Sequence, residues 1–300
     1  MGSTAWSKST YRSTSALLSS KPLHELYSAQ KASPEYLVDS IEFRESRDSE
    51  AHPNAVPIIV GLDVSGSMGF IAEDMAKRSL GPIVEQSIDR FQDFDPHILF
   101  AAIGDAMAGD QYPCQITQFE SDTRIWDQLT SLFLEGGGGG NQYESYDLAW
   151  AFAAQKTRSD AWDKRQRKGY LFTVGDEQFP ERINQAYYKR AITGNHSWIT
   201  PENVLADAQK MYHVFHVNVL EGNYNRYRKG SSETSWRQRL GNRLLQLDDH
   251  KNVASVIVAA IAVNEGFPVS EVVESFQTDS IRTSVANALG YNQQAFNEAE

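Results

Sequence analysis

The chain has 300 residues, of which 41% are hydrophobic and 22% charged, and these proportions exclude a wholly disordered or fibrous protein. The length allows either one large domain or one domain with extensions. Lys+Arg minus Asp+Glu is 28 − 39 = −11, so no overall positive field attracts a polyanion, and we expect no nucleic-acid partner. The only cysteine, Cys114, excludes an internal disulfide and a multi-cysteine zinc site.

Residues 1–55 are expected to form an N-terminal extension. Half of the first 20 residues are Ser or Thr. Such a stretch buries too little apolar surface to fold alone, so we expect the start of the chain to be flexible. The remainder of this extension is mixed in composition, and its pattern predicts one helix over residues 34–45.

The sequence shows no signal that would direct the chain to a membrane. Its first residues lack the apolar run that is typical of a signal peptide. The longest apolar run covers residues 253–263, contains Ser255 and is too short to span a bilayer. We therefore expect a cytoplasmic protein with no membrane partner.

The regular pattern of strands and helices begins at Val56. Residues 56–62 form a continuous apolar run, which is typical of a strand buried on both faces. Apolar residues at helical spacing then predict a long helix over residues 71–91. Two strand-like runs follow at 97–103 and 114–119, and the linker between them is too short for a crossover helix. We therefore expect these two strands to form an antiparallel hairpin.

The second half of the chain continues the alternation. Thr200 before Pro201 marks a helix start, with the threonine as N-cap. The alternation predicts an α/β fold with a mainly parallel sheet and one antiparallel edge strand, over residues 56–250, followed by a C-terminal helical extension at 251–300. The other predicted elements are strands at 169–174 and 212–220 and helices at 123–134, 143–156, 178–192, 236–247, 253–264, 269–276 and 280–289.

Oxygen-bearing side chains follow the first predicted strand directly. Asp63, Ser65 and Ser67 occupy alternate positions, so an extended turn points their three oxygens to one side. One carboxylate and two hydroxyls form a hard-oxygen set that suits Mg²⁺ or Mn²⁺. Alternatively, Asp63 caps the helix that follows it.

Two further segments are expected at the same edge of the sheet. Five glycines at 136–140 precede Asn141, Glu144 and a predicted helix start, and Asp176 follows the strand at 169–174. We expect the glycine run either to contribute to a ligand site at this edge or to serve only as a flexible hinge. Ligands of open α/β sheets bind where strands end, so we expect Asp63 and Asp176 to meet there. Two buried carboxylates repel each other, and a cation would offset this repulsion.

Together these motifs resemble the metal-ion-dependent adhesion site of von Willebrand factor A domains, which have a Rossmann-like fold. Asp63-x-Ser65-x-Ser67 is similar to the first motif of that family, and Asp176 matches its third. The predicted edge hairpin also resembles the family fold, and the resemblance covers roughly residues 56–250.

The second motif departs from the usual family pattern. Gly140 stands where the family usually has a Thr, and the stretch through Asn141 and Glu144 is similar to a Gly-Gly-Gly-Asp-x-x-Glu variant. The resemblance implies that Asn141, with Glu144, replaces the Thr oxygen directly or through water. It also implies a bound Mg²⁺, with Mn²⁺ or Ca²⁺ as alternatives. The implied metal site comprises Asp63, Ser65, Ser67, Asn141, Glu144 and Asp176.

The resemblance implies a binding protein and not an enzyme. In this family a carboxylate from a partner protein takes the remaining position on the ion, and intracellular bacterial and viral members resemble adaptors for MoxR-type AAA+ ATPases. One alternative is a scaffold protein that self-assembles through its extensions, and another is a metal-dependent phosphohydrolase. Ser65 lacks the G-x-S-x-G context of a hydrolase nucleophile. A phosphoryl-accepting aspartate usually has a second Asp two residues on, where this chain has Ser65.

Two short basic clusters stand out in this acidic sequence. They cover residues 164–168 and 226–229. Each is expected to be a solvated loop, because isolated clusters of this size are common on protein surfaces.

Overall fold

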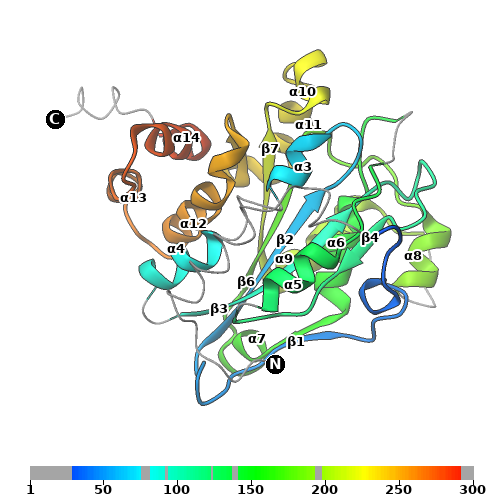
Figure 1. Cartoon of the computed structure of the whole chain (residues 1–300), viewed down its shortest axis with the longest axis horizontal. Helices are drawn as coiled ribbons and strands as arrows, with labels where there is room; N and C mark the ends of the chain where they lie inside the picture. Colours follow the sequence, from blue (N-terminus) through cyan, green and yellow to red (C-terminus); the bar gives the residue numbers. More distant parts are fainter. Residues whose placement is uncertain are drawn as a thin grey trace.

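The computed structural model describes residues 29–75, 82–91, 94–122, 124–136, 141–192 and 198–291. Its main feature is a six-stranded sheet in which β4 alone runs antiparallel to its neighbour (Figure 1). This confirms the predicted α/β class with one antiparallel edge strand. The strands lie in the order β4 (Cys114–Ile116), β3 (Asp95–Ile103), β2 (Ala55–Asp63), β6 (Gly169–Gly175), β7 (Tyr212–Val219) and β8 (Leu244–Leu247).

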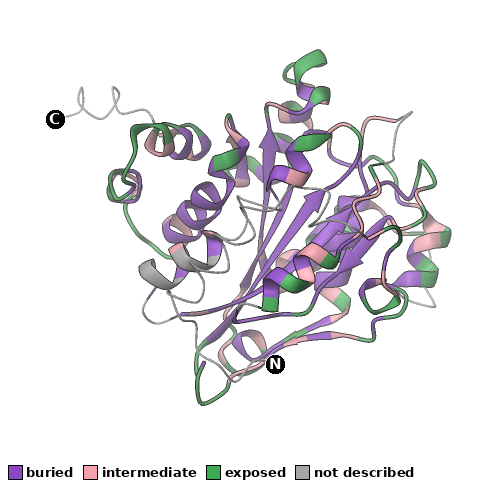
Figure 2. Cartoon of the chain, in the orientation of Figure 1, coloured by how far each residue is buried: buried purple, intermediate pink, exposed green. Residues whose placement is uncertain are grey.

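The central strands are buried on both faces, which explains their continuous apolar sequences. Every residue of β2 and β6 is buried. Side chains alternate along a strand, so Ile58 and Val60 of β2 join the hydrophobic cluster on one face, while Ile59 between them joins the cluster on the other. Figure 2 shows these strands as buried between two helical layers.

One helical layer contains the C-terminal helices. Ten consecutive residues of α12 are buried, so this helix packs within the layer and not on its surface. The members of this layer are α3 (Phe70–Asp74), α4 (Pro82–Arg90), α5 (Arg124–Ser131), α12 (Val253–Asn264), α13 (Val269–Glu274) and α14 (Asp279–Leu289).

The second layer covers the opposite face of the sheet. Thr200 caps α9 by accepting a hydrogen bond from the backbone N–H of Asn203, which confirms the predicted helix start. This layer contains α6 (Tyr146–Gln155), α8 (Gln185–Ala191), α9 (Pro201–Met211) and α11 (Ser231–Leu240). The smaller elements are β1 (Arg44–Ser46), β5 (Thr157–Ser159), α7 (Asp160–Arg165), α10 (Asn223–Tyr227), η1 (Pro34–Tyr36), η3 (Gly241–Arg243) and η4 (His250–Asn252).

The predicted helix over residues 34–45 is wrong. Only the short 3-10 helix η1 forms there, and Arg44–Ser46 is strand β1, which pairs in parallel with β5. The buried Arg44 guanidinium donates hydrogen bonds to the backbone carbonyls of Ile116 and Thr117. These long-range contacts favour an extended backbone that local spacing does not reveal.

Two other helix predictions are wrong in part. The helix predicted over 236–247 ends at Leu240, because Gly241 has a φ of 55°, and Leu244–Leu247 forms β8 beside β7. The helix predicted over 178–192 is shorter than expected and begins only after Asn184, whose side chain caps α8. Of the helix predicted over 71–91, both described parts are helical, and residues 76–81 lie outside the described chain.

Within the described residues, no helix combines the length and the apolar character needed to cross a membrane.

Candidate metal centre

The carboxyl ends of β2 and β6 lie side by side at the point where the order of the sheet reverses. The chain adds β3 and β4 on one side of β2, and it adds β6, β7 and β8 on the other. Such a switch point is the usual ligand site of an open α/β sheet. Asp63 is the last residue of β2, and Asp176 directly follows β6.

Four of the six predicted ligands form one hydrogen-bonded group. The backbone N–H of Ser65 donates to Asp63 Oδ1 at 2.8 Å. The Ser65 and Ser67 hydroxyl oxygens lie 3.0 Å apart, and the Ser67 hydroxyl donates to Asp176 Oδ1 at 2.7 Å. The loop after β2 thus meets the loop after β6 through oxygen atoms of the kind that bind Mg²⁺.

Close packing fixes the two aspartates. The Tyr146 hydroxyl donates to Asp63 Oδ2 at 3.0 Å, and the backbone N–H of Tyr224 donates to Asp176 Oδ2 at 2.7 Å. Gly222 packs so tightly that a Cβ there would lie 2.3 Å from the Asp176 carboxylate. At Gly175 a Cβ would lie 2.0 Å from the Tyr146 hydroxyl oxygen. Both positions therefore need glycine for space.

The electrostatics of this pair are unfavourable without a counter-charge. Asp63 and Asp176 are both fully buried, and their hydrogen bonds come from hydroxyl and backbone N–H groups. Burial, and secondly the Asp176 carboxylate, raises the pKa of Asp63 to about 7. Burial also raises the pKa of Asp176. Two carboxylates and two hydroxyls are a donor set that fits a hard divalent cation.

Glu144 and Asn141 are placed differently. Glu144 is buried, and its Oε2 has no hydrogen-bond partner among the described residues. Its pKa is raised to about 11, first by burial and then by the Asp63 carboxylate. The Asn141 amide instead donates to Asp105, and its Oδ1 accepts from the backbone N–H of Tyr143. Of the glycine run before Asn141, residues 137–140 lie outside the described chain.

The structure adds two carboxylates that sequence reasoning missed. Asp105 follows β3 and is 1% exposed. Glu177 is also buried, and its Oε2 lacks a hydrogen-bond partner within the part of the chain that the structure describes. Burial, followed by Asp63 and Asp176, raises the pKa of Glu177 to about 9. The available signals were the position of Asp105 just beyond a predicted strand and that of Glu177 next to Asp176.

A second group of potential ligands lies after β7 and β8. Glu221, Asp249 and His250 each offer one ligand atom within 4.8 Å of the others. However, His250 Nδ1 lies 2.7 Å from Glu221 Oε2, and Nε2 lies 3.1 Å from Asp74 Oδ2. Both ring nitrogens are thus engaged by carboxylates. We interpret this group as a hydrogen-bond network that joins α3 to the loop after β7.

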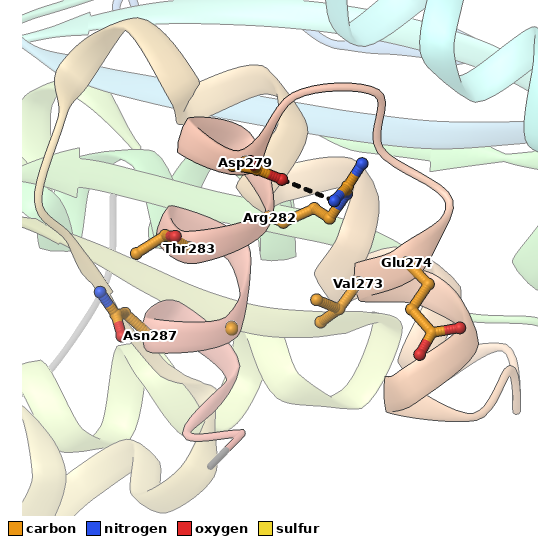
Figure 3. A pocket seen from close by; sticks show the side chains of 7 residues that line it. Val273, Glu274, Asp279, Arg282, Thr283 and Asn287 are labelled. Carbon is orange, nitrogen blue, oxygen red and sulfur yellow. Dashed lines mark hydrogen bonds and ion pairs between the residues drawn. The ribbon is translucent and has the colours of Figure 1, made fainter. Parts of the chain in front are cut away.

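A surface groove lies between α13 and α14 (Figure 3). Asp279 and Arg282 form an ion pair of 2.7 Å within α14, and the Asp279 side chain is 93% exposed. The groove lies apart from the candidate metal centre, because none of the predicted metal ligands lines it. Its lining residues are Val273, Glu274, Asp279, Arg282, Thr283, Ala286 and Asn287.

The sequence matches no protein-family model and no curated protein. Among solved structures, the fold is similar to proximal thread matrix protein 1 of the mussel byssus, at a TM-score of 0.46, 12% identity, 70% coverage of this chain and 48% of that one. It is also similar to the pilus adhesin SpaC from Lactobacillus rhamnosus GG, at a TM-score of 0.42 and 10% identity, with 76% of this chain and 32% of that one covered. The chain thus spans less than half of either structure, and likeness this weak carries no argument about function.

Proposed function

We propose that this chain is a metal-dependent protein-binding module of the von Willebrand factor A type. Its Mg²⁺ site would comprise Asp63, Ser65, Ser67 and Asp176. The observation that carries the proposal is the 2.7 Å hydrogen bond between Ser67 and Asp176, which joins the loops after β2 and β6 beside two buried carboxylates that have no cationic hydrogen-bond partner among the described residues. Mn²⁺ and Ca²⁺ are alternative ions for the same oxygens.

The residues around the site hold its ligands in place. Tyr146 orients Asp63, and the N–H of Tyr224 orients Asp176, so both carboxylates are preorganised. Glu144 and Glu177 are buried near them, and the Oε2 atom of each has no partner among the described residues, which supports a role for both in hydrogen bonds to water on the ion. When bound, the ion supplies a coordination position that accepts a carboxylate from another protein.

We propose that the partner is a protein, with a MoxR-type AAA+ ATPase as the leading class and the cytoplasm as the location. This part of the proposal depends on the family resemblance of the motifs at Asp63 and Asp176. A high net negative charge of −11 agrees with it, because the cation would create a local positive site on an acidic molecule. We propose binding and not catalysis, because the family resemblance of these motifs implies a binding protein.

Calorimetry with Mg²⁺ tests the metal site directly. The wild-type chain is expected to bind one Mg²⁺, and Ser67→Ala is expected to bind it at least about tenfold more weakly, because a ligand and the hydrogen bond to Asp176 are both lost. Thr283→Ala, on exposed α14, removes a comparable hydroxyl away from the site and serves as the control. Equal Mg²⁺ affinity in the wild type and Ser67→Ala would refute the proposed ligand set.

Affinity purification then tests the function. Bait protein is incubated with lysate in Mg²⁺ or in EDTA, and the proteins lost in EDTA are identified. We expect the same proteins to be lost with the Ser67→Ala bait in Mg²⁺ and retained with Thr283→Ala. A set of captured proteins that is identical in all four samples would contradict metal-dependent binding.

A further inference from the structure

A short basic helix stands beside the candidate metal centre. α10 follows β7 and projects beyond the end of the sheet, at the top of Figure 1. The basic cluster Arg226–Lys229 comprises the last two residues of this helix and the two that follow it, and every residue of the cluster is exposed. Tyr227 lies within this cluster and is 86% exposed.

The cationic side chains of this cluster are not paired with carboxylates of the described chain. Arg226, Arg228 and Lys229 form no ion pair with any described residue. By contrast, Arg47 and Arg165 each pair with carboxylates at 2.9 Å or less. These three cations are neighbours in the sequence and are exposed, so they form a local positive surface on a chain whose net charge is −11.

Hydrogen bonds attach α10 to both loops of the metal centre. The backbone N–H of Tyr224, in its first turn, donates to Asp176 Oδ2 at 2.7 Å. The N–H of Asn223 donates to the carbonyl of Ser67 at 3.2 Å. The basic cluster is therefore held on the same face of the molecule as the proposed ion.

Exposed apolar side chains accompany the cluster at this end of the sheet. Phe70 begins α3 directly after the Ser67 loop and is 65% exposed. Met107, just beyond β3, is 43% exposed, and Leu220, at the end of β7, is 41% exposed. Single exposed apolar residues are normal, but several around one site are typical of an interaction surface.

Resting on the proposed metal-dependent binding, we propose that the partner contributes an acidic segment with apolar side chains. One of its carboxylates reaches the ion, neighbouring carboxylates face Arg226, Arg228 and Lys229, and its apolar side chains contact Phe70 and Tyr227. Charge complementarity supports this choice of partner, because the ion and the cluster are both positive on an otherwise acidic chain. Attraction between these opposite charges raises the rate at which the partner associates with the chain and makes that rate dependent on salt concentration.

A short fluorescein-labelled peptide that alternates glutamate with tyrosine and serine is a suitable probe. The same peptide with glutamine in place of each glutamate is the uncharged control. Fluorescence anisotropy with the full chain in Mg²⁺ is expected to show binding of the glutamate peptide that EDTA abolishes. The glutamine peptide is expected to bind at least about tenfold more weakly.

Charge reversal separates this inference from the metal site itself. Arg226→Glu combined with Arg228→Glu is expected to weaken binding of the glutamate peptide by about tenfold or more and to flatten its salt dependence. Lys189→Glu combined with Lys210→Glu makes the same change in charge on the exposed last turns of α8 and α9. This control is expected to bind within about twofold of wild type.

Mg²⁺ calorimetry on each variant shows whether the metal site survives. Wild-type Mg²⁺ affinity with unchanged peptide binding after the Arg226 and Arg228 reversal would overturn the inference and leave the proposed function intact. Equal binding of the two peptides, or of neither, would also overturn it. Tighter binding of a single-stranded oligonucleotide than of the glutamate peptide, lost on reversal, would overturn it in favour of nucleic acid. Absence of Mg²⁺ binding by the wild type would instead refute the proposed function on which the inference rests.

Discussion

Replacing Asp63 by asparagine tests the buried charge at the metal centre. Asparagine has nearly the shape of aspartate but no charge. In the metal-free protein, burial and the neighbouring Asp176 raise the pKa of Asp63 from 3.8 to about 7. A difference of about three pH units corresponds to ~4 kcal/mol at 1.36 kcal/mol per unit. That is the order of magnitude by which ionisation of Asp63 disfavours the folded state.

The effect has a defined pH dependence. Because the pKa of Asp63 is higher in the folded than in the unfolded state, the folded chain holds this proton more tightly. Its contribution to the free energy of unfolding is complete below pH 3.8, is lost as the pH rises towards about 7, and is absent above it. In EDTA, Asp63→Asn is therefore expected to match wild type near pH 4. At pH 8 it is expected to be more stable by about 2–4 kcal/mol, after allowance for weakened hydrogen bonds.

Urea denaturation in EDTA measures the cost of the buried charge, and urea denaturation in Mg²⁺ measures how far the ion stabilises the folded chain. With Mg²⁺ at 100 times its Kd, wild type is expected to gain about 2.7 kcal/mol and Asp63→Asn almost nothing. Asp207→Asn, on the surface of α9, is a control that removes a carboxylate which is 41% exposed, and neither effect is expected there. An Asp63→Asn variant no more stable than wild type at pH 8 in EDTA would refute the argument from buried charge.

Three other substitutions give expected losses in the free energy of unfolding by urea. Gly222→Ala places a Cβ 2.3 Å from the Asp176 carboxylate at a permissive φ of −63°, so a purely steric loss of ~1–3 kcal/mol and weaker Mg²⁺ binding are expected; unchanged Mg²⁺ affinity would contradict this. His250→Ala removes the contacts to Asp74 and Glu221 and is expected to cost ~1–3 kcal/mol. An unchanged free energy of unfolding would show that this network does not stabilise the fold. Trp236→Ala empties a fully buried site and is expected to cost ~3–5 kcal/mol; a loss below ~1 kcal/mol would contradict the packing.

The sequence predicts the centre of the sheet well, because a strand buried on both faces needs a continuous apolar run. The strands at β2, β6 and β7 and the antiparallel edge pair are therefore confirmed. Strands that depend on distant partners are missed. β8 has the sequence Leu-Leu-Gln-Leu, which suits either a helix or a strand, and only pairing with β7 decides the outcome.

The sequence likewise predicts the residues that directly follow central strands of the candidate site, but not those in its longer loops. Asp63 and Asp176 directly follow strands that are adjacent in the sheet, so their meeting follows from the topology. Asp105 lies two residues beyond β3, in a loop whose path the sequence does not define. Asn141 was expected beside the metal ligands, but its amide bonds to Asp105, because both residues lie in loops whose relative position depends on tertiary packing.

The arrangement of α10 connects the metal centre to the surface that we propose for the partner. Its first N–H groups bond to the Ser67 carbonyl and the Asp176 carboxylate, so its position depends on the two loops that would hold the ion. A bound cation would add a bond to the Asp176 carboxylate, which already accepts hydrogen bonds from the Ser67 hydroxyl and the Tyr224 N–H, and would hold it more firmly. The ion would therefore do more than offer a coordination position. It would also fix Arg226 and Arg228 relative to that position, so that one acidic segment meets both at once.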